Sequence, residues 1–235
     1  MKPTIVVAGS SGALGEKLVF HLLNLGFDIT ACCNARSSRD RLEAKIQPSQ
    51  LESISFFVGD LSTQEGYSQL LSQLGTDNKA PMSYISTIGA FSYNHCESTT
   101  EEEFDVLLSL NMKSHWLATK NLLPIMRKQD YGNLIFVSSL PSLSLGTAGM
   151  SLYLASKAAL NMFVRCVAKE ISNTKININL ILPGTIDTPA NRKSMGDDQA
   201  DLWIPPIEIC KNIAKLIGLD AINVNGAFIT IPDRV

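Results

Sequence analysis

The stretch that decides the fold is Thr4-Ile5-Val6-Val7-Ala8-Gly9-Ser10-Ser11-Gly12-Ala13-Leu14-Gly15, in which a β-branched apolar run meets glycines spaced three apart. The run Thr4–Ala8 predicts a buried strand, and the leucine-rich segment Leu14–Leu25 predicts a helix directly after it. Glycines at such a junction let the backbone approach a pyrophosphate closely and point free N–H groups at it. The stretch therefore predicts a dinucleotide site; the alternative is a tight turn whose glycines only supply positive φ.

Short apolar runs continue to alternate with segments of helical period along the rest of the chain. The strands predicted in this way are Thr4–Ala8, Ile29–Cys33, Ile54–Val58, Ser83–Ile88, Gly132–Ser138, Asn177–Leu182 and Phe228–Ile231. The helices predicted between them are Leu14–Leu25, Ser68–Leu74, Thr100–Arg127, Ser151–Ile171 and Glu208–Ile217. Strand runs without strict polar alternation are typical of a parallel sheet that is covered on both faces. The predicted fold class is therefore α/β, a doubly wound sheet of about seven parallel strands with helices on both faces.

Length, composition and charge limit the kinds of protein that this can be. The chain has 235 residues, of which 45% are apolar and 18% charged, and this predicts one globular domain over residues 1–235. The formal net charge is −2 and the basic residues are spread along the chain, so nucleic acid is not expected as a partner. The cysteines, an odd number without a C-x-x-C pair, predict free thiols in a reducing compartment and no metal site.

Neither a signal peptide nor a membrane span is predicted. The apolar stretch Thr4–Ala8 is too short for a signal peptide, and no run approaches the roughly 18 apolar residues that cross a bilayer. We therefore expect a cytoplasmic protein without a membrane partner.

One long segment, Asp187–Pro206, is polar and has no clear periodicity. A loop of this length in a compact domain usually covers a binding site, so residues 187–206 are expected to form a substrate-covering loop. Its apolar side chains either line a pocket or anchor the loop, and the sequence leaves both readings open. These side chains are Met195, Leu202, Trp203 and Ile204.

A tyrosine and a lysine stand four positions apart in the segment Tyr153-Leu154-Ala155-Ser156-Lys157. On a helix this spacing places the two side chains on one face. A neighbouring ammonium group favours the phenolate form of a tyrosine, which would make proton transfer feasible near neutral pH. The pair is therefore a candidate acid/base site, although the same spacing also occurs on ordinary helix surfaces.

Five features appear in the order of the short-chain dehydrogenase/reductase family: Gly9–Gly15, Asn111, Val137-Ser138-Ser139, Tyr153–Lys157 and Pro183-Gly184. The chain resembles this family over nearly its whole length. The resemblance implies a single Rossmann-type domain that binds NAD(H) or NADP(H). It also implies hydride transfer between the nicotinamide and a carbonyl or alcohol carbon of a small molecule, by a homodimer or homotetramer.

The same resemblance assigns roles to particular residues. Tyr153 corresponds to the acid/base, Lys157 to its electrostatic partner and a ribose ligand, Ser139 to the group that orients the substrate oxygen, and Asn111 to the holder of a proton-relay water. Hydride delivery leaves charge on oxygen, which a positioned proton donor neutralises. The cofactor-binding residues implied are Gly9, Ser11, Gly12, Leu14, Gly15, Arg36, Asp60, Leu61, Gly89, Tyr153, Lys157, Pro183, Gly184, Ile186 and Thr188. No role is assigned to His21, His95 or His115.

Several departures from the family pattern keep alternatives open. The G-x-x-G-x-x-G spacing and the segment 182–195 resemble dihydropteridine reductases, so an activity of that kind is an alternative. Ser86-Thr87-Ile88-Gly89 stands where the family has Asn-Asn-Ala-Gly, and Ser139 precedes Tyr153 by 14 positions, one more than usual. Ser138 and Ser142 therefore remain candidates for the role of Ser139. A catalytically silent nucleotide-binding sensor is the second alternative.

The end of the second predicted strand bears on the choice of cofactor. Ala35 occupies the position where an NAD-preferring relative carries an acidic residue, and Arg36 follows it. A guanidinium group suits a 2′-phosphate, so NADP(H) is favoured over NAD(H); the alternative is a solvated residue at a helix start. Asp60 resembles the residue that contacts adenine and Thr188 the residue that contacts the nicotinamide end, or each caps a helix.

Overall fold

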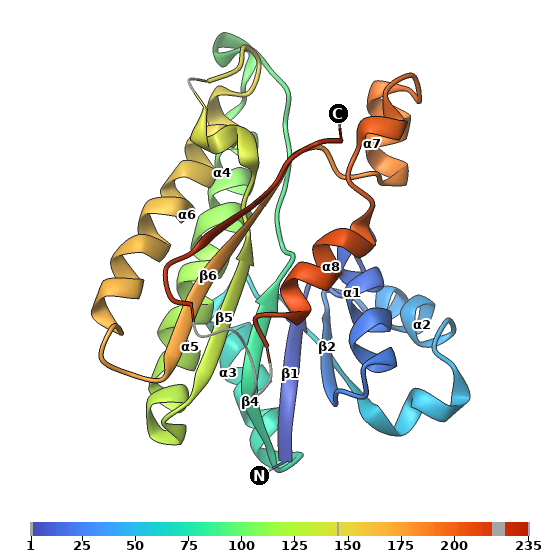
Figure 1. Ribbon diagram of the computed structural model, residues 1–235, viewed down its shortest axis with the longest axis vertical. Helices are drawn as coiled ribbons and strands as arrows, with labels where there is room; N and C mark the ends of the chain where they lie inside the picture. Colours follow the sequence, from blue (N-terminus) through green and yellow to red (C-terminus); the bar gives the residue numbers. More distant parts are fainter. Residues whose placement is uncertain (1, 145, 218–223, 235) are drawn as a thin grey trace.

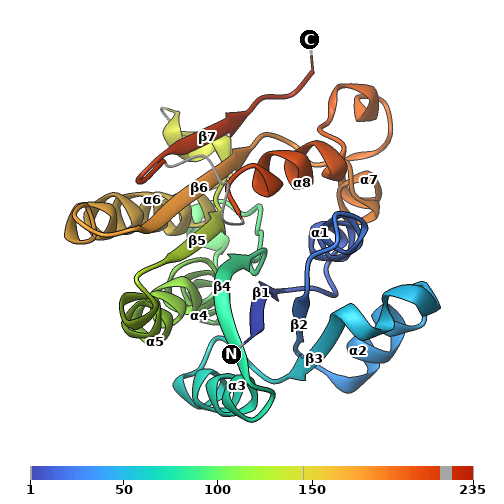
Figure 2. The same ribbon diagram turned by 60° about the horizontal axis from the view of Figure 1, so that its bottom comes forward.

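The computed structural model describes residues 2–144, 146–217 and 224–234. Within these residues one parallel sheet has the strand order β3-β2-β1-β4-β5-β6-β7 (Figure 2). The strands are β1 (Lys2–Ala8), β2 (Ile29–Cys33), β3 (Ile54–Val58), β4 (Lys79–Ser86), β5 (Gly132–Val137), β6 (Ile176–Pro183) and β7 (Phe228–Ile231). This confirms the predicted doubly wound sheet of seven parallel strands. The strand order reverses between β1 and β4, where folds of this class bind their ligands.

Helices pack on both faces of the sheet, as predicted. They are α1 (Ala13–Asn24), α2 (Arg36–Glu43), α3 (Gln64–Thr76), α4 (Glu101–Leu108), α5 (Ser114–Gln129), α6 (Ser151–Glu170), α7 (Pro189–Met195) and α8 (Pro206–Ala214). One face is covered by α1, α2 and α8, and the other by α3, α5 and α6 (Figures 1 and 2). No helix in the described residues combines the length and apolar character needed to cross a membrane.

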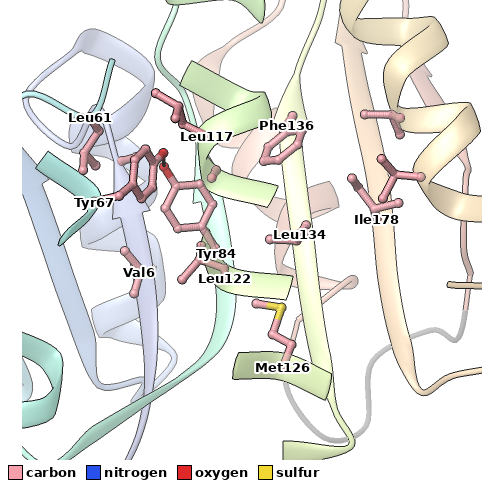
Figure 3. Close-up of a cluster of buried hydrophobic side chains, with 14 of the residues drawn as sticks. Val6, Leu61, Tyr67, Tyr84, Leu117, Leu122, Met126, Leu134, Phe136 and Ile178 are labelled. Atoms are coloured by element: carbon pink, nitrogen blue, oxygen red, sulfur yellow. Dashed lines mark hydrogen bonds between the residues drawn. The ribbon is translucent and has the colours of Figure 1, made fainter. Parts of the chain in front are cut away.

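The strand β1 shows how one short run forms two cores. Ile5 and Val7 face the layer of α1 and α8, whereas Val6 and Ala8 face the layer of α3, α5 and α6. The second layer also buries two tyrosines, Tyr67 and Tyr84, whose hydroxyl oxygens lie 2.7 Å apart (Figure 3). The Tyr67 hydroxyl also bonds the backbone carbonyl of Ser114, so this buried polar pair is satisfied inside an apolar layer.

The segment Thr100–Arg127, predicted as one helix, consists of two helices with a π-helical turn, Ser109–Lys113, between them. The apolar residues keep a helical spacing across this π-helical turn, because a wider turn changes only the direction in which the buried face points. The pattern therefore predicted one continuous helix, and that prediction was wrong. The turn matters for the site because it contains Asn111.

The segment 187–206 is more regular than the predicted loop. It contains α7 and a 3₁₀ turn, Ala200–Leu202. Trp203 and Ile204 are buried, and Ile204 forms a bridge with Ile186, so these two side chains anchor the segment. Met195 and Leu202 stay exposed. Arg192 ties the segment together, bonding Asp187 at 2.6 Å and Asp197 at 2.8 Å.

Candidate active site

A cleft of about 510 Å³ lies at the point where the strand order reverses. Its lining comes from the carboxyl ends of β1, β2, β3 and β4 and the loops that follow them, and from the π-helical turn Ser109–Lys113. The lining residues are Gly9, Ser11, Gly12, Cys32, Cys33, Asn34, Gly59, Asp60, Leu61, Ser62, Thr87, Ile88, Gly89 and Leu110. Six of the predicted cofactor residues are therefore together in one cleft: Gly9, Ser11, Gly12, Asp60, Leu61 and Gly89.

The glycine turn at the floor of this cleft depends on the absence of side chains. Gly9 has a φ of 78°, and a Cβ on Gly15 would lie 2.1 Å from the carbonyl oxygen of Gly9. Gly12 precedes α1 and gives that helix no side-chain cap, which leaves first-turn N–H groups free to meet an anion. Leu14 and Gly15 are buried at the start of α1 and do not line the cleft.

The glycine turn is also fixed from the neighbouring strand. The Thr87 hydroxyl donates to the carbonyl oxygens of Ala8 and Gly9, at 3.1 and 3.2 Å. Thr87 stands where the family pattern has an asparagine. The changed motif therefore still supports the turn, through a hydroxyl group.

The end of β2 lies in the cleft, but Arg36 lies beside it. Cys33 and Asn34 line the cleft, whereas Arg36 is the exposed first residue of α2, in an adjoining depression shared with Arg39 and Phe56. Arg39 stacks on the Phe56 ring and pairs with a glutamate of its own helix. Arg36 forms no ion pair in the described part of the chain and thus has a free guanidinium group next to the cleft.

Asp60 does not cap the following helix. Thr63 is the N-cap of α3, and its side chain accepts the N–H of Gly66. The Asp60 carboxylate instead accepts the N–H and the hydroxyl of Ser62, at 2.8 and 2.7 Å, while lining the cleft.

Ser139 and Tyr153 lie together beyond the carboxyl end of β5, and Lys157 lies one turn further along α6. Ser139 follows that strand, and the other two lie one turn apart on α6. The neighbouring Ser139 hydroxyl lowers the pKa of the Tyr153 phenol, but burial raises this pKa more strongly. Tyr153 is therefore protonated at neutral pH and able to give a proton away.

Lys157 differs from the prediction. Its side chain is buried, and its Nζ donates to the carbonyl oxygen of Val137 at 3.0 Å. Burial lowers the pKa of Lys157 to about 8. The predicted lowering of the Tyr153 pKa by a neighbouring ammonium group was wrong for the protein alone, because desolvation of the phenol outweighs the other effects.

The Asn111 side chain is fully used in holding the structure. Its amide nitrogen donates to Ala90 and Ser156, both at 2.9 Å, and its amide oxygen accepts the N–H of Ala90. A Cβ on Gly89 would lie 2.9 Å from that oxygen and 3.2 Å from the Lys157 Nζ, so only glycine passes between them. The backbone carbonyl of Asn111, which the buried His115 ring also contacts, is the group left for a water.

The segment after β6 does not contribute to the glycine cleft in this structure. The Thr188 side chain accepts the N–H of Asn191 and is the N-cap of α7, the capping alternative left open above. Gly184 lies against the Asp233 carboxylate, and Ile186 forms the bridge that holds the 187–206 segment. Pro183 ends β6.

Two side chains near the site were not predicted. The Phe91 ring lies edge-on to the Tyr153 ring at a centroid distance of 4.9 Å. Asn161 contacts both Ser138 and Ser142, the two serines that flank Ser139. The signal for Asn161 was its place four residues after Lys157, on the face that carries Tyr153. No group of histidine, cysteine and acidic side chains in the described residues could hold a metal ion.

A parallel sheet with a glycine turn at its switch point and a Ser–Tyr–Lys group beside it defines a dinucleotide-binding type of α/β protein. The family model described as short chain dehydrogenase matches residues 3–199, and the chain therefore belongs to the short-chain dehydrogenase/reductase family, as the sequence motifs indicated.

Relatives agree with this assignment. The chain is 24% identical over 218 residues to a 3-oxoacyl-[acyl-carrier-protein] reductase from Pseudomonas aeruginosa, covering 91% of this chain and 87% of the relative. It is 26% identical over 157 residues to a cyclopentanol dehydrogenase from Comamonas sp., covering 63% and 62%. The solved structure of ElxO with NADP bound matches with a TM-score of 0.90 at 20% identity, covering 99% and 98%. That of 4-hydroxyisoleucine dehydrogenase with NADH matches at 0.87 and 19%, covering 100% and 98%.

Proposed function

We propose that this protein is an NADPH-preferring reductase of small carbonyl compounds that uses Tyr153 as the proton donor. The observation that carries the proposal is the interaction of the Ser139 hydroxyl with the half-buried, protonated Tyr153, with the buried Lys157 one turn away on the same helix. A substrate oxygen between these two hydroxyl groups would be oriented by one and protonated by the other. The reverse reaction, alcohol oxidation, uses the same groups.

A nicotinamide dinucleotide suits this cleft, because Gly9 and Gly12 line it at the strand-to-helix turn, where a pyrophosphate would approach the main chain. The predicted cofactor residues that line the cleft would hold it, namely Gly9, Ser11, Gly12, Asp60, Leu61 and Gly89, and when bound it supplies the hydride. Structural neighbours with NADP, NADPH or NADH bound support this assignment.

The proton step follows from the charges in the site. Tyr153 Oη gives its proton to the substrate oxygen, and the ammonium group of Lys157 stabilises the phenolate that remains. The Asn111 carbonyl would hold the water that returns a proton, as the family resemblance implies, since both N–H groups of the Asn111 side chain already donate and its oxygen already accepts from Ala90.

The preference for NADPH rests on Arg36. Its guanidinium group is exposed beside the cleft, and no acidic residue stands at the end of β2 to bind a ribose 2′-OH. A charge-assisted bond to the 2′-phosphate contributes about 1.5–3 kcal/mol.

Three further expectations belong to the same proposal. Residues 187–206 would cover the substrate, with α7 and the exposed Met195 and Leu202 above the site. We propose that residues 1–235 act as one catalytic domain in the cytoplasm. The family resemblance implies a homodimer or homotetramer, which light scattering coupled to size exclusion would measure.

The test is the variant Tyr153→Phe, assayed for NADPH oxidation with a panel of ketones. We expect turnover to fall by about 10²-fold or more, the usual contribution of general acid catalysis, while NADPH binding is retained. The matched control is Tyr131→Phe, which removes a hydroxyl bonded to Asn133 at the start of β5 and should leave turnover unchanged. Undiminished turnover in Tyr153→Phe would show that this phenol is not the proton donor.

The same panel separates the alternatives when it includes a quinonoid dihydropterin and is run with NADH and NADPH. A strong pterin rate with negligible ketone rates would assign the dihydropteridine reductase-like activity instead. Tight NADPH binding without turnover on any carbonyl or alcohol would assign a silent nucleotide-binding sensor.

A further inference from the structure

Residues 138–143, which follow β5, include three serines, of which Ser139 is the one that acts on the Tyr153 phenol. Ser138 and Ser139 follow the last residue of β5, Val137, and Ser142 lies in the 3₁₀ turn Leu140–Leu143. This is the loop that is one residue longer than the family pattern. A longer loop gives Ser139 more freedom, so some contact must fix its position.

Asn161 supplies contacts on both sides of Ser139. It lies on α6, two turns beyond Tyr153 and one turn beyond Lys157, and is 6% exposed. The Ser138 hydroxyl donates to its amide oxygen at 2.6 Å, and its amide nitrogen donates to the Ser142 hydroxyl at 2.8 Å. Ser142 in turn donates to the backbone carbonyl of Ser139.

These contacts form one directed chain of hydrogen bonds. An amide oxygen only accepts, so Ser138 must donate to it, and the amide nitrogen only donates, so Ser142 must accept from it. The single proton of Ser142 is then free to reach the Ser139 carbonyl. If the Asn161 amide were flipped, its oxygen would accept the Ser142 proton, which would then no longer reach the Ser139 carbonyl. Only the observed orientation therefore connects Asn161 to the backbone of Ser139.

We propose that Asn161 is the positioning residue that holds the Ser139 hydroxyl against Tyr153. Tyr153, Lys157 and Asn161 occupy successive turns of one helix, so the same rigid element carries the acid and clamps the serine that orients the substrate oxygen. Because the Asn161 amide is buried, it has few alternative hydrogen-bond partners, and the arrangement of Asn161, Ser138, Ser142 and Ser139 is therefore well defined. We call this arrangement the clamp. The role belongs to the proposed carbonyl chemistry, but the hydrogen bond that it protects is measurable without a substrate.

The first test is an NMR measurement on protein labelled with ¹³C at the tyrosine ζ position. The Tyr153 signal is assigned by its loss in Tyr153→Phe, and its shift at neutral pH reports the hydrogen bond from Ser139. We expect Ser139→Ala to move this signal, and Asn161→Leu to move it in the same direction by at least about half as much. An unmoved signal in a folded Asn161→Leu variant, with a moved one in Ser139→Ala, overturns the proposal.

The second test is kinetic, with the ketone that the panel identifies. We expect Asn161→Leu to lower kcat by about tenfold or more with little change in the Kd of NADPH, since misplacing an orienting group acts on the chemical step. In a Ser139→Ala background the same change should lower kcat by less than about twofold, because the residue it positions is already gone. If Asn161→Leu lowered kcat by the same factor in the parent and in the Ser139→Ala background, Asn161 would not act through Ser139.

Two further variants keep the result decisive. Asn177→Leu removes a buried amide at the opposite end of the sheet, which contacts Asn133 only weakly, and should change neither the signal nor kcat. Ser142→Ala breaks the same chain with a smaller cavity, in case Asn161→Leu does not fold, and should move the Tyr153 signal too. If the Tyr153 signal moved in these variants as expected but the protein reduced no carbonyl compound, the proposed function would be rejected and the positioning role of Asn161 would stand.

Discussion

The two sides of the site are built by different means. On the side of β1 and β4 the cleft owes its shape to the main chain, because the turn from Gly9 to Gly15 admits no side chain at its tightest point. On the side of β5 and α6 the geometry is set by side-chain hydrogen bonds, which run from Ser138 through Asn161 and Ser142 to the carbonyl of Ser139. A backbone cradle tolerates little change, whereas a side-chain network can be altered one bond at a time.

The largest effect that separates the two sides is expected from Gly15→Ala. The new Cβ would lie 2.1 Å from the Gly9 carbonyl oxygen, so the turn must move. We expect the Kd of NADPH, measured by fluorescence titration, to rise by about 100-fold or more. The Tyr153 signal should stay in place, because its hydrogen bond lies on the other side.

The control for this prediction is Gly75→Ala in α3, where no atom lies within 4 Å of the added Cβ. It should bind NADPH like the parent and be slightly more stable, since alanine favours a helix over glycine. If Gly15→Ala bound NADPH within about threefold of the parent, the backbone of the turn from Gly9 to Gly15 would not be the rigid element that shapes this side.

Arg36→Ala sharpens the comparison, because it tests a side chain on the side otherwise made by backbone. Since Arg36 has no ion-pair partner in the described residues, its removal should cost little stability. We expect the parent to bind NADPH about 10- to 100-fold more tightly than NADH, and the variant to lose most of that difference with NADH binding nearly unchanged. Titration of both cofactors against both proteins measures this, and an equal weakening of both would exclude Arg36 as the reader of the 2′-phosphate.

The sequence predicted the backbone side better than the side-chain side. Glycine spacing next to a buried strand is a local signal, so the turn and the sheet were predicted and the sheet is confirmed. The π-helical turn at Asn111 was missed because the apolar pattern runs through it. Asn161 was missed because its partners lie 23 and 19 positions away and only the fold brings them together.

The thiol of Cys33 illustrates the same limit. It lines the cleft and accepts a hydrogen bond from Ser11, while burial raises its pKa, so it is a neutral wall of the site. The sequence predicted a free thiol but gave no reason to place it beside the glycine turn. For Arg36 the sequence predicted its place after β2, but not that its side chain lies beside the cleft and not in it.

The smallest effect concerns the charge of Lys157, whose pKa burial lowers to about 8. As the pH rises through 8 this residue loses its proton and no longer stabilises the phenolate left on Tyr153. The rate of carbonyl reduction should therefore fall by about tenfold between pH 7 and pH 9. The titratable groups around it are Tyr153, which keeps its proton over this range, and His115, whose pKa of about 3 leaves it neutral.

A loss of stability would not explain this fall in rate, because the stability that Lys157 contributes rises with pH over the same range. The unfolded chain holds the Lys157 proton up to about pH 10.5, whereas the folded protein releases it near 8, so this residue makes the folded state more stable as the pH rises between these values. Stopped-flow rates across pH 6.5–9.5, with unfolding midpoints at each pH, separate the two effects. Lys157→Arg, which keeps its charge, should show a flat profile if it folds, and Lys157→Met a uniformly low rate without this step. A tenfold fall that persists in Lys157→Met would assign the titration to another group and leave the charge of Lys157 without a part in the proton step.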